Sequence, residues 1–394
     1  MSFIDDARRL LRENIREYGM FIALFIIMVV FAITTDGLFI SSRNLVNLVN
    51  QTGYIAVLAV GMTLVIVIRH IDLSVGFLAG FLGAVAAIAM VSWQLPVYAV
   101  IPLVMVFGIL AGLVSSFMVA QLGIPAFVAT LAGWLGYRGA LQLVTRSTGT
   151  IIIPNESFNA IGIGFIPDPL DIGILPDMHK LTLVLGLLGI IFFVSGEFRA
   201  RARMRTQKIE VSSTEMFILK LVFISALIGG IAWILAGYQG LSWTAVVVLI
   251  VVMLYDFVTR RTVLGRHIYA VGGNPEAAEL SGISVKRITH VVFASMGMLS
   301  ALSGILYAAR LRSATTTAGN LFELDAIAAT FVGGVSAAGG VGRVMGSLIG
   351  ALVMTSLTSG MNLMGMDISY QYIVRAIVLA AAVIFDVATR KTGK

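Results

Sequence analysis

The sequence contains no cysteine among its 394 residues. Disulfides, thiolate-bound zinc, iron–sulfur clusters and cysteine nucleophiles are therefore excluded. Histidine is also scarce, and no two of the four histidines have the i, i+3 or i, i+4 spacing that places two metal ligands on one helical face. We expect neither a dedicated metal site nor a cofactor.

Charge is the next scarcity, since only 12% of the residues are charged and 58% are apolar. A soluble globular chain carries about 25% charged residues, and coiled coils or disordered tails carry more. With a mean hydropathy of +0.98, the chain fits none of these classes. It has only 8 prolines but 41 glycines, which favours closely approaching helices over linkers. The composition predicts an all-α polytopic membrane protein.

Apolar runs along the chain give the expected number of spans. A bilayer core of about 30 Å needs about 20 helical residues. Runs of roughly this kind occur at 18–35, 52–68, 76–92, 97–119, 124–145, 181–195, 216–236, 243–258, 289–308, 325–340, 343–360 and 371–386. Two of the last three meet at a glycine-rich stretch ending at Gly342. We expect 12 spans if every run crosses, or 10 if some are half-helices.

The basic residues indicate orientation. Residues 1–17 form a charged lead-in, and placing them inside puts two basic loops, 196–215 and 259–288, and the basic carboxyl tail inside as well. The opposite-side loop 146–180 is mostly acidic and contains four prolines, so we expect either a packed cap or a docking surface there. This distribution follows the positive-inside rule and predicts that both termini are cytoplasmic. Contact with anionic lipid is compatible with it, whereas no nucleic-acid-binding motif is present.

A short capped helix is predicted within the loop 259–288. Asn274 has the properties of an N-cap, Pro275 those of a first helical residue, and Gly282 those of a stop. Such a rigid surface helix would suit docking to another protein; the alternative is an incidental amphipathic connector. The candidate docking residues are Gly272, Gly273, Asn274, Pro275, Glu276, Ala277, Ala278, Leu280, Ser281 and Gly282.

Ionisable residues at membrane depth are candidate functional residues, because they are costly in lipid. Asp72, with Ser74 nearby, precedes a glycine-rich helix, where it could cap the helix or hydrogen-bond a solute. Glu323 and Asp325 likewise precede an expected small-residue helix, Ala326 to Gly340. The first helix would begin inside and the second outside, as an inverted repeat requires.

Aromatic and amide side chains complete the candidate path, because aromatic faces can pack on a solute and amides or guanidinium groups can hydrogen-bond its polar groups. The alternative for each arginine is snorkelling to the interface or pairing with an acid. The candidate path residues are Asp72, Ser74, Trp134, Tyr137, Arg138, Asn320, Glu323, Asp325, Gln371 and Arg375. A phosphate-binding loop of the G-x-x-x-x-G-K-[ST] type is absent from the sequence, so the chain should not hydrolyse ATP itself.

Four motifs also resemble the permease subunits of bacterial ATP-binding-cassette (ABC) importers for monosaccharides. They are Gly272–Ile283, Ile71–Gly76, the stretch 318–329, and the glycine-rich stretch 333–342, and they occur in that family's order. An additional portion at 181–238, with two spans, is most similar to the xylose-type members. The resemblance implies a single permease domain over 1–394 with a type II importer bundle.

The resemblance also implies a function. Two copies would form a pathway for xylose or a related pentose or aldose in the bacterial inner membrane. ATP hydrolysis would occur on a separate cytoplasmic subunit, and a periplasmic sugar-binding protein would deliver the substrate. Alternatives are a permease for another solute, such as a branched-chain amino acid, and a sugar facilitator that needs no ATPase. A membrane-embedded enzyme is disfavoured because no nucleophile–base pair is evident.

Overall fold

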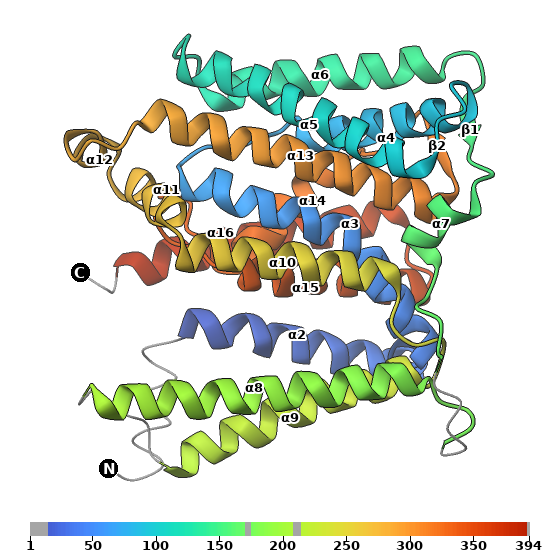
Figure 1. Cartoon of the computed structure of the whole chain (residues 1–394), viewed down its shortest axis with the longest axis vertical. Helices are drawn as coiled ribbons and strands as arrows, with labels where there is room; N and C mark the ends of the chain where they lie inside the picture. The colour runs from blue at the N-terminus through green and yellow to red at the C-terminus, as the bar shows by residue number, and fades with distance from the viewer. Residues whose placement is uncertain (1–14, 170–174, 208–213, 392–394) are drawn as a thin grey trace.

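The computed structural model describes residues 15–169, 175–207 and 214–391. The described part is almost entirely helical, and its long helices run side by side between two ends of the molecule (Figure 1). One end carries the short helices α11 and α12, and the other carries helix α7 and strand β1. The expected all-α polytopic membrane fold is confirmed.

Long helices alternate with short elements along the chain. The first part of the chain forms α2 (Ile15–Thr34), the 3₁₀ helix η1 (Leu38–Ile40), α3 (Ser42–Val67), α4 (Val75–Val91), α5 (Val97–Ala120), α6 (Ala126–Thr145), β1 (Thr150–Ile152) and α7 (Glu156–Ile163). The remainder forms α8 (Lys180–Thr206), α9 (Thr214–Ala236), α10 (Trp243–Arg261), α11 (Val263–Gly273), α12 (Pro275–Leu280), α13 (Val285–Leu311), β2 (Ser313–Thr315), α14 (Phe322–Val332), α15 (Val344–Leu363) and α16 (Ile368–Lys391).

Within the described ranges, eight helices are long and apolar enough to cross a membrane, and two shorter apolar helices, Gly19–Thr34 and Val75–Val91, accompany them. The expected helix from 325 to 340 is wrong, because α14 ends at Val332. The chain then turns through Gly334 and Gly339, whose φ values of +84° and +80° do not continue a helix. With 11 residues, α14 rises only about 16 Å, so it is a half-helix.

Helices α3 and α13 form the centre of the bundle. Every residue of α3 from Ile55 to Val67 is buried, and α13 packs against α3, α4 and α5. Helix α5 approaches α13 closely at two facing glycines, because a Cβ on Gly108 would meet the backbone of Gly297 and one on Gly297 would meet that of Gly108. Small residues thus let the two helix backbones approach closely. This matters in lipid, because burying apolar side chains there contributes little to helix association.

The expected external loop 146–180 contains a strand and a helix within its described residues, 146–169 and 175–180. Its strand β1 pairs antiparallel with β2, with Ile151 opposite Ala314. Helix α7 is capped by Asn155, whose side chain accepts a hydrogen bond from Phe158 N at 3.0 Å, and it packs on α13. The packed-cap interpretation therefore describes the fold of this segment. Whether it also docks another protein stays a prediction.

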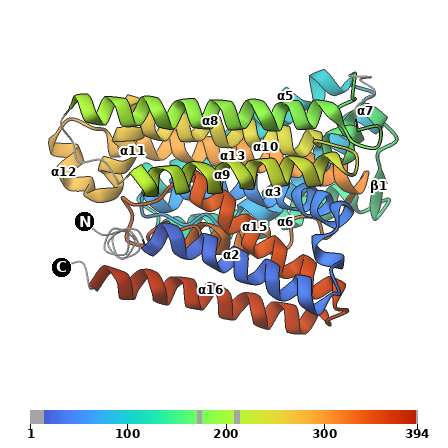
Figure 2. The same cartoon turned by 90° about the horizontal axis from the view of Figure 1, so that it is seen from below.

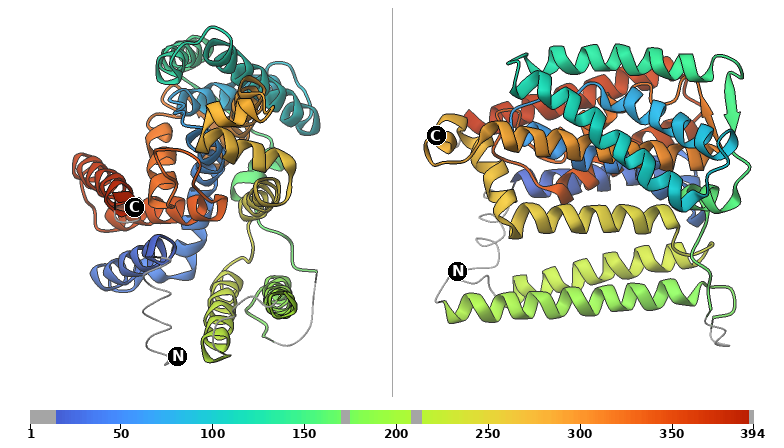
Figure 3. Two further views of the ribbon diagram at one scale, coloured as in Figure 1. Left: turned by 90° about the vertical axis from the view of Figure 1, so that its left-hand side faces the viewer. Right: turned by 45° about the horizontal axis from the view of Figure 1, so that its top comes forward.

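Helices α8 and α9 form a hairpin at the edge of the bundle (Figures 2 and 3). The expected basic loop 196–215 is wrong as a loop, because α8 continues to Thr206 and α9 begins at Thr214. The residues after Arg199 are mostly good helix formers, so α8 continues without interruption beyond its apolar run. The lead-in 1–17 lies largely outside the described residues, since the structure begins at Ile15.

Candidate functional site

The predicted capped helix is present as α12. Asn274 Oδ1 accepts a hydrogen bond from Ala277 N at 3.0 Å, and Pro275 is the first helical residue. Gly282 follows the helix with φ +82°, a conformation that favours glycine. The side chain of Leu280 is 91% exposed, so α12 presents an apolar group at the end of the molecule. Most of the expected loop 259–288 is thus helical, as α11, α12 and the flanking ends of α10 and α13.

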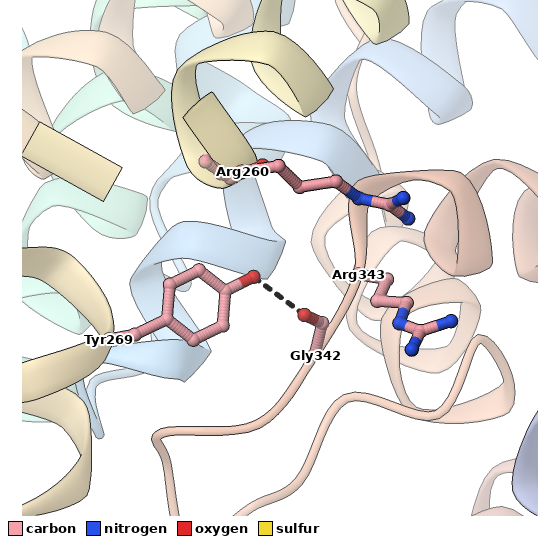
Figure 4. A pocket seen from close by; sticks show the side chains of 5 residues that line it. Arg260, Tyr269, Gly342 and Arg343 are labelled. Atoms are coloured by element: carbon pink, nitrogen blue, oxygen red, sulfur yellow. Dashed lines mark hydrogen bonds between the residues drawn. The ribbon is translucent and has the colours of Figure 1, made fainter. Parts of the chain in front are cut away.

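Gly272 and Gly273 belong to the end of α11 and not to a loop. Helix α11 is joined to the segment before α15 by Tyr269, whose Oη donates to Gly342 O at 2.6 Å. Figure 4 shows this bond beside Arg260 and Arg343, which line the same pocket of about 330 Å³. Helix α11 therefore connects α12 to α10, to α13 and to the glycine-rich segment 333–342.

Four of the candidate path residues meet where the middle of α6 lies beside the starts of α4 and α14. Trp134 Nε1 donates to Glu323 Oε1 at 3.0 Å, and the Glu323 side chain is buried. The Trp134 ring meets Phe77 edge-on at 5.0 Å, and the Arg138 guanidinium lies over both rings at 5.4 and 5.6 Å. Tyr137, one turn along α6, stacks on another α4 ring, Phe81. We name Phe77, Trp134, Arg138 and Glu323 the aromatic–acid cluster.

Asp72 and Ser74 lie beside this cluster and bind each other. Asp72 Oδ1 accepts from Ser74 N at 2.9 Å and from Ser74 Oγ at 2.6 Å. Both side chains are buried, and Gly133 of α6 lies against Ser74. The carboxylate holds the turn before α4, whereas the N-cap residue of α4 is Ser74, whose side chain makes no cap hydrogen bond. The helix-capping role and the solute-binding role of Asp72 both stay predictions.

A second group lies on α14, α15 and α16. Arg375 Nη1 donates to both oxygens of Asp325 at 3.2 and 3.3 Å, and Nη2 donates to Thr358 Oγ1 at 2.8 Å. Gln371 Nε2 donates to Asn362 Oδ1 at 2.8 Å. The arginine is therefore paired with an acid inside the bundle, which was the alternative to a solute contact. We name Asp325, Thr358 and Arg375 the ion-pair triad.

The remaining expectations concern the start of α14. Glu323 and Asp325 lie in its first turn and do not precede it, because Leu321, in a left-handed conformation, begins the helix one turn earlier than predicted. Asn320 lies exposed in the preceding turn, where its backbone N donates to Thr317 O. The starts of α4 and α14 pack on each other, since Gly76 lies against Gly319 O and Gly319 against Gly76 O. Such reciprocal contacts fit the inverted repeat, which stays a prediction.

Metal-binding groups are not evident among the residues that the structure describes. No three His, Asp or Glu side chains gather there in a way that could hold an ion. The acids at membrane depth instead bind a tryptophan, a serine or an arginine. The chemistry available at these sites is hydrogen bonding and ring stacking.

Comparison with known proteins decides the family. The family described as the branched-chain amino acid transport system / permease component matches residues 44–383. The chain belongs to this permease family. The permease is 38% identical over 380 residues to the Xylose transport system permease protein XylH of Haemophilus influenzae, covering 96% of this chain and 98% of that protein. The permease is also 38% identical to XylH of Escherichia coli K12, and the match covers 96% of this chain and 93% of that relative.

A ribose permease is also related. The Ribose import permease protein RbsC of Haemophilus influenzae is 36% identical over 373 residues, covering 94% of this chain and 93% of the relative. No solved structure matches the permease.

Several residues that build these sites were not singled out from the sequence of the permease. Phe77 and Thr358 complete the aromatic–acid cluster and the ion-pair triad, but they are ordinary residues of apolar helices. Tyr54, Tyr307 and Phe322 form an aromatic trio with ring centroids 4.9 to 5.1 Å apart. In the sequence, the only indication of this trio was that Tyr54 and Tyr307 each lie within an expected span.

Replacing Asn274 with alanine should loosen α12 without unfolding the permease. The variant loses the side chain that accepts from Ala277 N, and such a cap contributes about 1 kcal/mol. We expect faster amide hydrogen exchange confined to residues 276–280, measured by mass spectrometry. Glu279→Ala, an exposed change in the same helix that removes no cap, is the control. Equal exchange in the N274A and wild-type proteins would contradict the prediction.

Proposed function

We propose that this chain is the transmembrane permease subunit of an ATP-driven importer that carries xylose or a related pentose across the bacterial inner membrane. The observation that carries the proposal is the 38% identity to xylose permeases over 96% of the chain. The ribose permeases follow at 34–36% identity over 94% of the chain, so a pentose is the common substrate class of these names.

In this proposal, ATP is hydrolysed by a separate cytoplasmic subunit that binds α12. Helix α12 is capped and largely exposed, and its apolar Leu280 offers a contact that a partner would cover. The absence of a phosphate-binding loop from the sequence supports the division of labour. The end of the bundle with α12 is then cytoplasmic. It also holds the start of α2 and the end of α16, so both termini face the cytoplasm (Figure 1).

The charges support this orientation. The basic residues at the ends of α8 and α10, including Arg203, Arg205, Arg260 and Arg261, lie at the α12 end. Arginine and lysine favour the cytoplasmic side and contact anionic lipid there. The opposite end, with β1 and α7, then faces the periplasm and a sugar-binding protein.

We place the sugar path beside the aromatic–acid cluster, in an assembly of two copies of the chain. A sugar needs hydrogen-bond partners to replace water and an apolar face on which to stack. Trp134 and Glu323 provide both types of group, with Arg138 and the aromatic trio nearby. Because Asp72, Ser74 and Asp325 already bind other protein groups, we expect weak sugar binding in a partly hydrated passage.

The family description favours one second candidate, a branched-chain amino acid permease. The two candidates differ in the charge of the substrate, because an amino acid is zwitterionic and a pentose is neutral. A facilitator without an ATPase is the other alternative, and it would not need α12.

Uptake by the reconstituted complex separates these possibilities. Vesicles with the permease, its ATP-binding subunit and its binding protein should accumulate radiolabelled xylose or ribose, but not leucine, and only with ATP. Replacing Glu276 with lysine or Gly282 with valine should reduce uptake about tenfold while the dimer still assembles, since both changes fall on the docking segment. Ile191→Val on α8, an exposed position of the α8–α9 hairpin, is a control for substitution at a helix surface. Leucine uptake, or pentose uptake without ATP, would contradict the proposal.

A further inference from the structure

Three segments that are far apart in the sequence meet beneath α12. They are the end of α3, the last two residues of α11, and the segment that leads into α15. Gly340 N donates to Val67 O at 2.9 Å. Arg69 Nε donates to Gly272 O at 2.7 Å, and its Nη2 donates to Gly273 O. We name Val67–Arg69, Gly272–Gly273 and Gly339–Gly342 the Arg69 junction.

The backbone of Arg69 is unusual. Its φ is +66°, in the left-handed region where glycine is favoured and a long side chain is disfavoured. The side chain compensates by donating to the last carbonyls of α11, which have no partner within their helix and carry the negative end of its dipole. A glycine at this position would relax the backbone but would leave those carbonyls without the arginine.

The junction is packed too tightly for its parts to move independently. A Cβ on Gly339 would lie 2.8 Å from Val67 O and 2.9 Å from Gly272 O, and one on Gly340 would lie 2.9 Å from Gly273 Cα. A displacement of the end of α11 therefore displaces Val67 and the segment before α15. Tyr269, through its bond to Gly342 O, adds a second connection between α11 and that segment.

Arg69 is also close in the sequence to residues that are buried inside the bundle. Asp72 and Ser74 follow it directly and hold the turn that starts α4. The first turn of α4 packs on Glu323, the acid of the aromatic–acid cluster. A short sequence of contacts thus leads from α12 through Gly273 and Arg69 to the start of α4, without passing along α10 or α13.

We propose that Arg69 is a positioning residue that transmits displacement of α11 and α12 to the end of α3 and the start of α4. The inference rests on the proposed function, in which an ATP-binding subunit moves α12. One route of transmission would pass through the helices that adjoin α12 in the sequence. The inference adds a second route and assigns it to the side chain of Arg69.

Coupling in the intact complex tests the role of Arg69. Arg69→Gly relieves the left-handed backbone and removes the side chain, so the complex should assemble and keep its basal ATPase rate. We expect stimulation of ATPase and uptake by the sugar-loaded binding protein to fall about tenfold, within the usual range of a coupling between two sites. Arg69→Lys, which keeps one donor group, should recover part of the stimulation. Arg199→Gln removes an exposed cytoplasmic arginine and should change neither value.

A distance measurement tests transmission directly, and the cysteine-free sequence allows it without background labelling. Spin labels at Ile71→Cys and Glu279→Cys, both exposed positions, report the start of α4 and α12. When ATP binds the complex, we expect α12 and residue 71 to move together, so that the distance distribution stays narrow. In the R69G protein the distribution should broaden or shift, because α12 moves alone.

The outcomes separate the two proposals. Unchanged stimulation in the R69G protein, or label distances that match the wild type, would overturn the role of Arg69. Failure of the wild-type complex to take up a pentose would overturn the proposed substrate, but the label distances require only nucleotide and the ATP-binding subunit. If the R69G protein does not assemble, the R69K protein carries the same comparison.

Discussion

Replacing Asp325 with asparagine should lower the free energy of unfolding by about 2–3 kcal/mol, the cost of leaving one charge of a buried pair in the membrane without its partner. Arg375 would keep Thr358 and one amide oxygen at position 325 as acceptors, but it would lose the negative charge of Asp325. The arginine side chain is 19% exposed and that of Asp325 21%, so water screens this pair little. SDS-induced unfolding of the purified chain in detergent measures the loss.

The double variant distinguishes charge from packing. Arg375→Gln alone should be as harmful as D325N, because it leaves the carboxylate of Asp325 unpaired. The D325N and R375Q changes together leave two neutral amides that can bind each other, so we expect about half of the loss to be recovered. Removing the more exposed pair between Asp256 and Arg260, which are 2.9 Å apart within α10, should cost less than about 0.5 kcal/mol. Additive losses from D325N and R375Q would show that the two residues do not interact.

The ion-pair triad also shows why α16 needs a specific attachment. Helix α16 packs mainly on α14 and α15, and most of its apolar surface is exposed. Lipid contacts such a surface as well as protein does, so apolar packing alone fixes the helix weakly. Arg375 and Gln371 bind α14 and the end of α15, and they set the position and rotation of α16.

Local features of this chain could be predicted from the sequence, and long-range pairings could not. The cap of α12 lies within four residues, so Asn274, Pro275 and Gly282 were sufficient to place it. Most of the spans followed from hydropathy, whereas the run 325–340 contains only the half-helix α14. By contrast, the partner of Arg375 lies 50 residues away and that of Arg69 more than 200, and no periodicity in one sequence reports such distances.

The wrong expectations have one physical origin. Helix ends were predicted where apolar composition changes, but backbone conformation decides them. Helix α8 continues through its arginines because nothing there stops a helix, whereas α14 ends inside an apolar stretch because glycines with positive φ follow it. Composition therefore predicts the lipid-facing length of a helix better than its ends.

Replacing Gly76 with alanine should have the largest effect of any single methyl group near the aromatic–acid cluster. Its Cβ would lie 2.5 Å from Gly319 O and would overlap Glu323 Oε2. The carbonyl cannot retreat easily, because Gly319 itself has φ +82° and packs against Gly76 O. We expect a loss of about 3 kcal/mol in unfolding free energy, at the upper end for overpacking, together with loss of sugar uptake.

Two further variants separate the shape of this site from its charge. Gly136→Ala, on the exposed side of α6, adds the same methyl group where no atom lies within 4 Å, and it should leave stability and uptake unchanged. Glu323→Gln keeps an oxygen that accepts from Trp134 Nε1 but removes the negative charge. If the carboxylate binds sugar hydroxyls, the E323Q protein should fold normally and need a higher sugar concentration for half-maximal uptake. Normal uptake by both the G76A and E323Q proteins would place the path elsewhere in the bundle.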